Sequence, residues 1–339
     1  MGVGNHPHST PMKNNKNKTS AALRALPWLA PVLVLIAAIV AYPMGLMIFN
    51  STRKISRIGR DKGFVGLDNY TKVLSDPALP RVLANTAIWV IAVVVITIVL
   101  SLALANFLNK AFPGRRLVRL AVIIPWAASV VMTTTVVYYS LQPKLGLAQQ
   151  FLKDIGLTSR TDLGITSQPI PAFLVAIAVA VFVSLPFTTY TLLAGHQAIT
   201  NDVLEAARVD GASKVRTYFS IILPQLKPAL ATATTINIIN VFNNIPILQV
   251  MTGAIPGNSA DTTTTLLFKY IRARGHVDWA SALSVLNLVL MIVIIGIYLA
   301  LAKPMRGVED SCSKTGGNGT ANRRPREHTR TPACALQRA

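Results

Sequence analysis

Amide side chains recur along an otherwise apolar block of the sequence that covers about residues 228–252. Asn237, Asn240 and Asn244 are spaced i, i+3 and i+7, so a continuous helix would carry all of them on one face. Amides donate and accept hydrogen bonds, as the hydroxyl groups of a sugar require. Hydrogen bonding between neighbouring helices explains the same pattern equally well, because an unsatisfied amide in an apolar environment is costly. The residues alone leave both interpretations open.

The polar connection before this block groups three acids, Asp202, Glu205 and Asp210. Asp202 and Glu205 have the spacing of a capping box, which predicts the start of a helix. Gly211 offers the left-handed conformation that ends a helix, and Ser213 can cap a second one. The connection is therefore predicted to be a short helix–turn–helix at the membrane surface.

Six long apolar blocks must position these residues, because about 20 apolar residues cross the hydrocarbon core. They carry no Asp or Glu, and no basic residue lies near the centre of a block. The chain is 52% hydrophobic and 14% charged, so a membrane protein is favoured over a nucleic-acid-binding one despite the net charge of +20. We predict an all-α membrane protein with six transmembrane helices at about residues 25–49, 84–108, 117–141, 170–195, 228–252 and 280–302.

The distribution of basic residues predicts the orientation of these spans. With both termini in the cytoplasm, the inner segments, counted together with Arg119 at the inner end of the third block, hold 20 of the 33 Lys and Arg residues and the outer loops hold 13. Residues 1–24 and 304–339 are polar and are predicted to be a disordered cytoplasmic arm and tail. Cys312 and Cys334 both lie in that tail, so we expect no disulfide framework.

Catalytic and cofactor signatures are missing from the sequence. It contains no nucleophile–base pair, metal-ligand cluster or Walker motif, and its five histidines are scattered. We therefore expect a non-catalytic protein with no metal and no cofactor on this chain.

The polar connection also carries a motif. Glu205-Ala206-Ala207 is followed after three residues by Gly211, and after nine more by Ile221-x-Leu223-Pro224. This pattern resembles the EAA motif of the membrane subunits of binding-protein-dependent ABC importers. Phe64-Val-Gly-Leu-Asp-Asn-Tyr70, Ile124-Pro-Trp126 and Ser281-Ala-Leu-Ser284 are similar to the carbohydrate-uptake branch, in particular to the first of its two paired, maltose-type permeases.

The resemblance covers about residues 25–303 and implies the six-helix fold of a type I ABC importer permease. It implies that residues 199–224 are a coupling helix that docks on a cytoplasmic ATPase. Glu205 would pair with a cation of that ATPase, Ala206 and Ala207 would permit close approach, and Gly211 would set the turn after Asp210.

The resemblance also implies a substrate path formed by Asn237, Asn240 and Asn244 together with Phe187 and Ser184 of the fourth block. The implied partners are a second permease, an ATPase dimer that carries ATP and Mg²⁺, an extracytoplasmic binding protein, a carbohydrate and membrane lipid, with no nucleic acid. The implied location is the bacterial inner membrane.

Two alternatives stay open at this point. An importer of the same type for a polyamine or glycerol phosphate fits the motif, although an anionic cargo predicts basic residues deep in the spans. An ion-coupled secondary transporter would need carboxylates within the membrane, and the six blocks contain none. The sequence does not identify the sugar.

Overall fold

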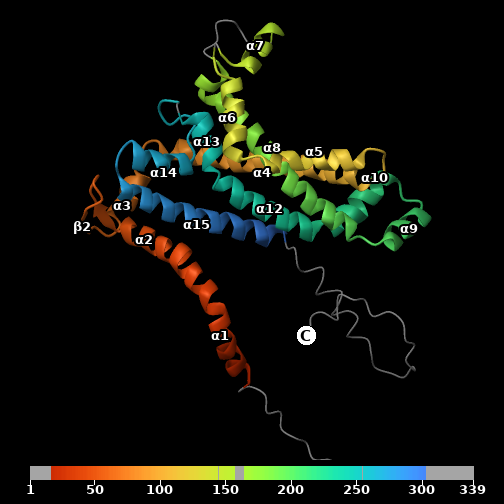
Figure 1. The fold of residues 1–339 in the computed structure, drawn as a ribbon, viewed down its shortest axis with the longest axis horizontal. Coiled ribbons are helices and arrows are strands. Elements are labelled where there is room, and N and C mark those ends of the chain that lie inside the picture. The colour runs from red at the N-terminus through yellow and green to blue at the C-terminus, as the bar shows by residue number, and fades with distance from the viewer. Residues whose placement is uncertain (1–16, 144, 157–163, 254, 303–339) are drawn as a thin grey trace, which may run out of the picture.

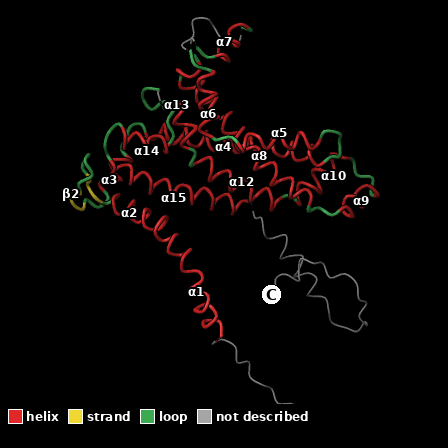
Figure 2. The backbone as a smooth tube through the Cα atoms, in the orientation of Figure 1, coloured by secondary structure: helices red, strands yellow, loops and turns green. Residues whose placement is uncertain are grey.

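The computed structural model describes residues 17–143, 145–156, 164–253 and 255–302. Helices make up most of this part of the chain, as predicted, and long helices lie side by side along its long axis (Figure 1). Loops gather at the two ends of that axis (Figure 2). The predicted tail and its cysteines fall outside the described residues, as does most of the predicted N-terminal arm.

Four helical stretches in the described residues are long and apolar enough to cross a membrane, and a bent helix pair makes a fifth. The structure therefore does not confirm six spans that are each one continuous helix. The third and fifth predicted spans are each broken into two. The four unbroken stretches are Pro27–Ser51, α4 (Leu79–Asn109), α8 (Pro169–Gln197) and α15 (Val277–Ala302).

The first span consists of α1 (Asn17–Ile36), the π-helical turn η1 (Ala37–Ala41) and α2 (Tyr42–Ser51). The sequence predicts a kink at Pro43, and the π-helical turn comes directly before that proline. Proline lacks an N–H group and clashes with the preceding turn, so a local widening of the helix accommodates it. The helix starts earlier than predicted, and α1 diverges from the body of the molecule (Figure 1).

A small hairpin and a short helix close the end of the molecule next to α2. Strands β1 (Arg53–Ile55) and β2 (Asp61–Phe64) pair antiparallel and lead into α3 (Asp68–Leu74). The buried Asn69 donates from Nδ2 to the carbonyls of Ser51 and Arg53, at 2.9 and 2.8 Å. The Tyr70 hydroxyl lies 2.8 Å from Ser51 Oγ. The Asn-Tyr pair of the sequence signature thus fastens α3 to the end of the first span.

The main core lies between α4 and α8 and includes buried residues of two later helices, α12 (Lys227–Phe242) and α13 (Ile245–Thr252). Trp89 of α4 is 1% exposed and donates from Nε1 to the Val241 carbonyl at 2.9 Å. This bond satisfies a carbonyl close to the point where α12 ends. It anchors the break in the fifth predicted span to the second span.

The third predicted span bends by 90° between α5 (Arg115–Ala127) and α6 (Val130–Ser140). Ala128 and Ser129 adopt extended backbone conformations at the bend. The adjoining short elements are α7 (Leu147–Asp154) and the 3-10 turn η2 (Ile165–Ser167). By contrast, α8 remains one helix through the buried Pro186.

The fifth predicted span breaks at Asn243 and Asn244. The connection that follows, an outer loop in the predicted orientation, includes α14 (Thr263–Arg272), which leads into α15. Asn85 of α4 donates to the carbonyls of Ser259 and Asp261, at 3.0 and 2.9 Å, and so holds this connection against the second span.

Candidate coupling segment and substrate path

The predicted helix–turn–helix is present as α9 (Asn201–Val209) and α10 (Lys214–Thr217). The π-helical turn η3 (Tyr218–Ile222) and α11 (Leu223–Gln225) then lead into α12. We call residues 201–222 the coupling segment. It lies at the opposite end of the long axis from the β-hairpin (Figure 1).

Gly211 closes the first helix of the coupling segment in a Schellman motif. Its N–H donates to the Arg208 carbonyl and the Ala212 N–H donates to the Ala207 carbonyl, both at 3.0 Å. Gly211 has φ +71°, a value that side chains other than glycine adopt only at a cost. An added Cβ would meet no atom within 4 Å, so conformation rather than crowding makes glycine the best residue here.

The start of the first helix differs from the prediction. Thr200 occupies the cap position, and no side-chain hydrogen bond caps the helix. Asp202 therefore lies in the first turn, where its charge favours the helix electrostatically. The second helix follows the prediction, because Ser213 Oγ accepts from the Arg216 N–H at 3.3 Å.

The coupling segment exposes both charge and apolar surface. Glu205, Ala206 and Asp210 are exposed, whereas Ala207 is 4% exposed and packs inward. Of the two alanines in the motif, Ala206 is therefore the one available to a partner. Val209, Val215 and Phe219 are 87%, 68% and 62% exposed. Apolar side chains exposed to this degree beside acids are typical of a surface that another protein covers.

The three amides of the predicted path do not share one helix face, because α12 ends at Phe242. Asn237 is 3% exposed and donates from Nδ2 to Thr188 Oγ1 of α8 at 2.7 Å. Asn240 is exposed, and Asn244 caps α13 by accepting from the Ile247 N–H at 3.3 Å. Asn237 thus serves the packing of α12 on α8, and of the three amides Asn240 is the exposed one.

Phe187 and Ser184 both lie half-buried on α8, one helical turn apart. Thr188, the next residue after Phe187, accepts the hydrogen bond from Asn237. The structure therefore places the predicted α8 residues close to the first of the α12 amides. Contact with a substrate stays a prediction for all five path residues.

A cavity of about 380 Å³ opens beside the break in the fifth predicted span. Asn243 and Asn287 contribute two amides, Thr264 and Ser284 contribute two hydroxyls, and no charged residue lines it. Asn287 is 8% exposed although it lies in the sixth span. The sequence analysis missed this residue, although an amide within an apolar block was a sufficient signal. The full lining is Pro43, Met44, Met47, Phe242, Asn243, Ile245, Thr264, Leu267, Ser284, Asn287, Leu288 and Met291.

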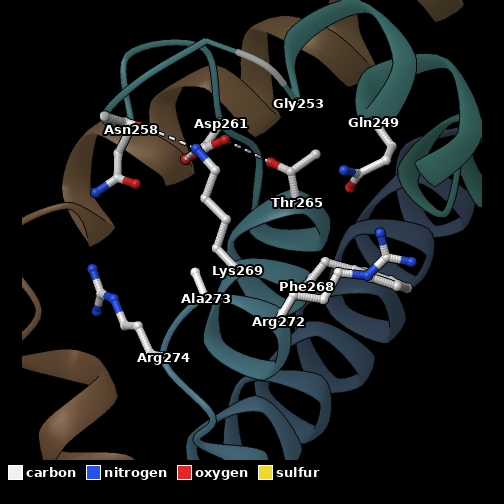
Figure 3. Close-up of a pocket in the computed structure, with 11 residues that line it drawn as sticks. Gln249, Gly253, Asn258, Asp261, Thr265, Phe268, Lys269, Arg272, Ala273 and Arg274 are labelled. Carbon is white, nitrogen blue, oxygen red and sulfur yellow. Dashed lines mark hydrogen bonds and ion pairs between the residues drawn. The ribbon is translucent and has the colours of Figure 1, made fainter.

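A second cavity of about 500 Å³ lies along α14, at the end that the predicted orientation places outside (Figure 3). Lys269 reaches across it to Asp261, at 2.7 Å between Nζ and Oδ2, and to the Gly257 carbonyl at 2.6 Å. Arg272 lies over the Phe268 ring at 5.6 Å. Cations and amides that line one hollow suit a ligand rich in hydrogen-bond acceptors.

A buried ion pair adjoins this outer cavity. Asp76 accepts from Arg274 Nη1 and from the Tyr270 hydroxyl, both at 2.8 Å. Burial alone would raise the pKa of Asp76, but the Ala78 N–H, Arg274 and Tyr270 together hold it below its usual value. Burial and the Asp76 carboxylate raise the pKa of the Tyr270 phenol, so that it stays a hydrogen-bond donor.

Within the described residues, no group of three or more His, Cys, Asp or Glu side chains is placed to hold a metal ion.

Comparison with known proteins places this geometry in context. A family model described as "binding-protein-dependent transport system inner membrane component" matches residues 97–306. The trehalose/maltose transport system permease protein MalF of Thermococcus litoralis is 34% identical over 281 residues, covering 83% of this chain and 92% of that protein. The sn-glycerol-3-phosphate transport system permease protein UgpA of Yersinia pestis is 28% identical, covering 80% of this chain and 91% of that protein.

A solved structure shares the fold. A chain of a bacterial ABC transporter involved in the import of the acidic polysaccharide alginate superposes with a TM-score of 0.74 at 19% identity. The match covers 86% of this chain and 100% of that chain. The broken third and fifth spans are therefore compatible with the fold of an ABC importer permease.

Proposed function

The chain belongs to the family of binding-protein-dependent transport system inner membrane components, and we propose that it is the permease subunit of an ATP-driven importer of a neutral sugar. Membership confirms the resemblance carried by the EAA motif. The observation that carries the proposal is the coupling segment, whose exposed acids and apolar side chains flank a glycine-closed turn. Such a surface has a function only when a second protein binds it.

The proposed mechanism runs from the coupling segment to the break in the fifth span. An ATPase dimer binds Glu205, Ala206 and the exposed Val209, and its closure on ATP and Mg²⁺ moves the segment. Helices η3, α11 and α12 are consecutive, so a displacement of α10 is transmitted along the chain to Asn243. This chain performs no catalysis in the scheme, because hydrolysis takes place on the ATPase.

The break itself is the proposed gate. Trp89 fixes the end of α12 to α4, while α13 starts in a new direction after the Asn244 cap. A rigid α12 can then tilt about this fixed end. The tilt would make Asn240 and Asn243 accessible from one side of the membrane and then from the other. A second permease supplies the opposite wall, and an extracytoplasmic binding protein delivers the sugar to the outer end.

The chemistry of the cavity beside the break favours a neutral cargo. Amides, hydroxyls and apolar side chains line it, and no cation is available there to bind a phosphate. A sugar fits this lining better than glycerol phosphate does. We assign the inner membrane as the location and place both termini in the cytoplasm, in accordance with the distribution of basic residues.

Uptake by the purified complex in proteoliposomes tests the proposal. With ATP enclosed on the coupling-segment side, labelled trehalose or maltose should accumulate, and glycerol 3-phosphate should not. Glu205→Ala should reduce both uptake and stimulated ATP hydrolysis. Uptake of glycerol 3-phosphate alone would establish the alternative cargo, and uptake without ATP would contradict the ATP-driven mechanism.

A further inference from the structure

A third cavity, of about 430 Å³, lies between the end of α4 and the first turn of α5. Its lining includes Phe112, Arg115, Arg116 and Leu117. This hollow is at the same end of the long axis as the coupling segment (Figure 1). It is distant from the break in the fifth span, and the transport mechanism above makes no use of it.

Cations surround this hollow without matching acids. Lys110, Arg115, Arg116 and Arg119 lie within ten residues of one another, and the sequence has no acid between positions 77 and 153. Among the described residues, the ion pairs at 4.0 Å or less include none of these four cations. The four positive charges are therefore not neutralised by a described part of this chain.

Two of these guanidinium groups are also partly buried. Arg115 Nε, together with Arg119 Nε and Nη2, is shielded from solvent and has no hydrogen-bond partner in the described structure. A buried charged donor without an acceptor is strongly unfavourable. Of these two arginines, Arg115 lines the hollow and Arg119 does not, so an anion from outside the chain that enters the hollow would supply an acceptor for Arg115.

The surface beside the cations is apolar. Leu117, Leu120 and Ile124 recur at i, i+3 and i+7 on α5 and are between 60% and 73% exposed. Phe107 and Phe112 form a tilted ring pair, with centroids 4.6 Å apart, next to the hollow. A ligand that matches both features has an anionic head group and an apolar chain that extends along the helix.

We propose that this hollow binds an anionic phospholipid. The phosphate lies against Arg115 and Arg116, with Lys110 at the edge, and an acyl chain follows the apolar stripe of α5. Basic pockets between transmembrane helices on the cytoplasmic side are suited to such head groups. Lipid binding at this site does not depend on which sugar is transported, so the lipid proposal is independent of the proposed function.

The fluorescence of Trp126 provides a direct readout of lipid binding, because this side chain is 64% exposed on the same helix. It lies ten residues beyond Arg116, or about 15 Å along α5, within the reach of an acyl chain. The assembled complex, with the exposed Trp28 replaced by Phe, is placed in phosphatidylcholine nanodiscs that contain a small fraction of phosphatidylglycerol with brominated acyl chains. A second set contains brominated phosphatidylcholine instead, and a Trp126→Phe variant identifies the signal.

Brominated phosphatidylglycerol should quench Trp126 more strongly than brominated phosphatidylcholine does. The preference should fall roughly tenfold or more in Arg115→Gln/Arg116→Gln, since each basic residue near an anionic surface changes binding about fivefold. Arg116→Gln alone should lose part of it. Arg272→Gln, at the outer end, is the matched control and should keep it. Millimolar inorganic phosphate should not compete, because the apolar chain contributes to binding.

Three outcomes would overturn the site. The first is equal quenching by the two lipids in the unmodified complex. The second is an unchanged preference in both arginine variants. The third is a Trp126 that no brominated lipid reaches, which would mean that the second permease covers this face. Competition by inorganic phosphate would instead identify a free-anion site and would contradict the lipid proposal.

Discussion

The two ends of the molecule use charge in opposite ways. At the end with the β-hairpin, which is the outer end in the proposed orientation, the carboxylates of Asp76 and Asp261 are buried and each pairs with a cation of the same chain. At the inner end, Glu205 and Asp210 are exposed and form no ion pair with a described residue. The outer end is therefore preorganised by its own contacts, whereas these acids of the coupling segment have no counter-ion among the described residues and, under the proposed function, interact with the ATPase.

The largest expected effect comes from a change that removes the shape of the inner end and leaves the outer end unchanged. Gly211→Val should abolish coupling, reducing ATP-driven uptake by an order of magnitude or more. The left-handed conformation costs a side chain about 1–2 kcal/mol, so the turn reorganises even though no clash forces it to. Uptake and ATP hydrolysis in proteoliposomes measure the effect, and the thermal midpoint should fall by no more than a few degrees.

Gly211→Asn is the matched control, because asparagine tolerates the left-handed region. It should retain most of the uptake. Normal transport by the valine variant would show that the coupling segment does not dock in the conformation described here.

The next largest effect is expected at the outer end. Asp76→Ala leaves Arg274 and Tyr270 without their shared acceptor and should destabilise the protein by about 2–4 kcal/mol. We place the value below that of a fully buried pair because the Arg274 side chain is 39% exposed. Thermal unfolding in detergent measures the loss, and hydrogen exchange should increase in α14.

Asp68→Ala removes a comparable pair at the surface, where Lys72 and Asp68 are 41% and 48% exposed. It should cost less than about 0.5 kcal/mol. Equal losses of stability for Asp68→Ala and Asp76→Ala would contradict the conclusion that the Asp76 ion pair stabilises the outer end more than an exposed ion pair does.

A smaller effect should distinguish the roles of Asn237 and Asn240 in the fifth predicted span. Asn237→Ala breaks the bond to Thr188 and should lower stability by roughly 1 kcal/mol, the scale of interhelical hydrogen bonds in membranes. Asn240→Ala should leave stability unchanged and weaken sugar uptake. The two variants are compared by thermal midpoint and by uptake at several sugar concentrations. If Asn240→Ala lowered stability and Asn237→Ala weakened only uptake, Asn240 would have the structural role and Asn237 the role in the pathway.

The smallest expected effect is a loss of stability of the folded protein at low pH. Because the pKa of Asp76 is lower in the folded protein than its ordinary value of 3.8, its stabilisation is complete above that value and is lost as pH falls through the lower folded one. The thermal midpoint should therefore fall more steeply below about pH 4 in the unmodified protein than in Asp76→Asn. Parallel curves would show that Asp76 contributes no linked stability.

Sequence patterns predicted the helices with strong local signals and missed the breaks between them. Gly211 and Ser213 act as predicted because a turn and a cap depend on neighbouring residues. The bond from Trp89 to the Val241 carbonyl joins two helices that are distant in the sequence, so no local pattern reveals it. The break after Phe242 does have a local signal, because Asn244 caps α13 and Pro246 lies in its first turn, and the prediction of one continuous helix overlooked it. The predicted shared face of Asn237, Asn240 and Asn244 failed for this reason.

The outer end was the least predictable region. Asp76 pairs with Arg274, and Asn85 holds the backbone at Asp261, across long separations in the sequence. Charges in loops are usually solvated, so single residues in the sequence gave no reason to pair them. The Asn-Tyr signature could be recognised, but its physical role became evident only with Ser51 in place.

The divergent first helix has a consequence for how the protein is made. In its most apolar stretch, within Pro27–Ser51, no residue is buried by the rest of the described chain. The second half of the span, α2, packs against α15 of the same chain, so it is the first half whose free energy is set mainly by lipid and, in the proposed complex, by a neighbouring subunit. A copy synthesised in excess would display an uncovered helix to the membrane's proteases, so its lifetime would follow the supply of its partner.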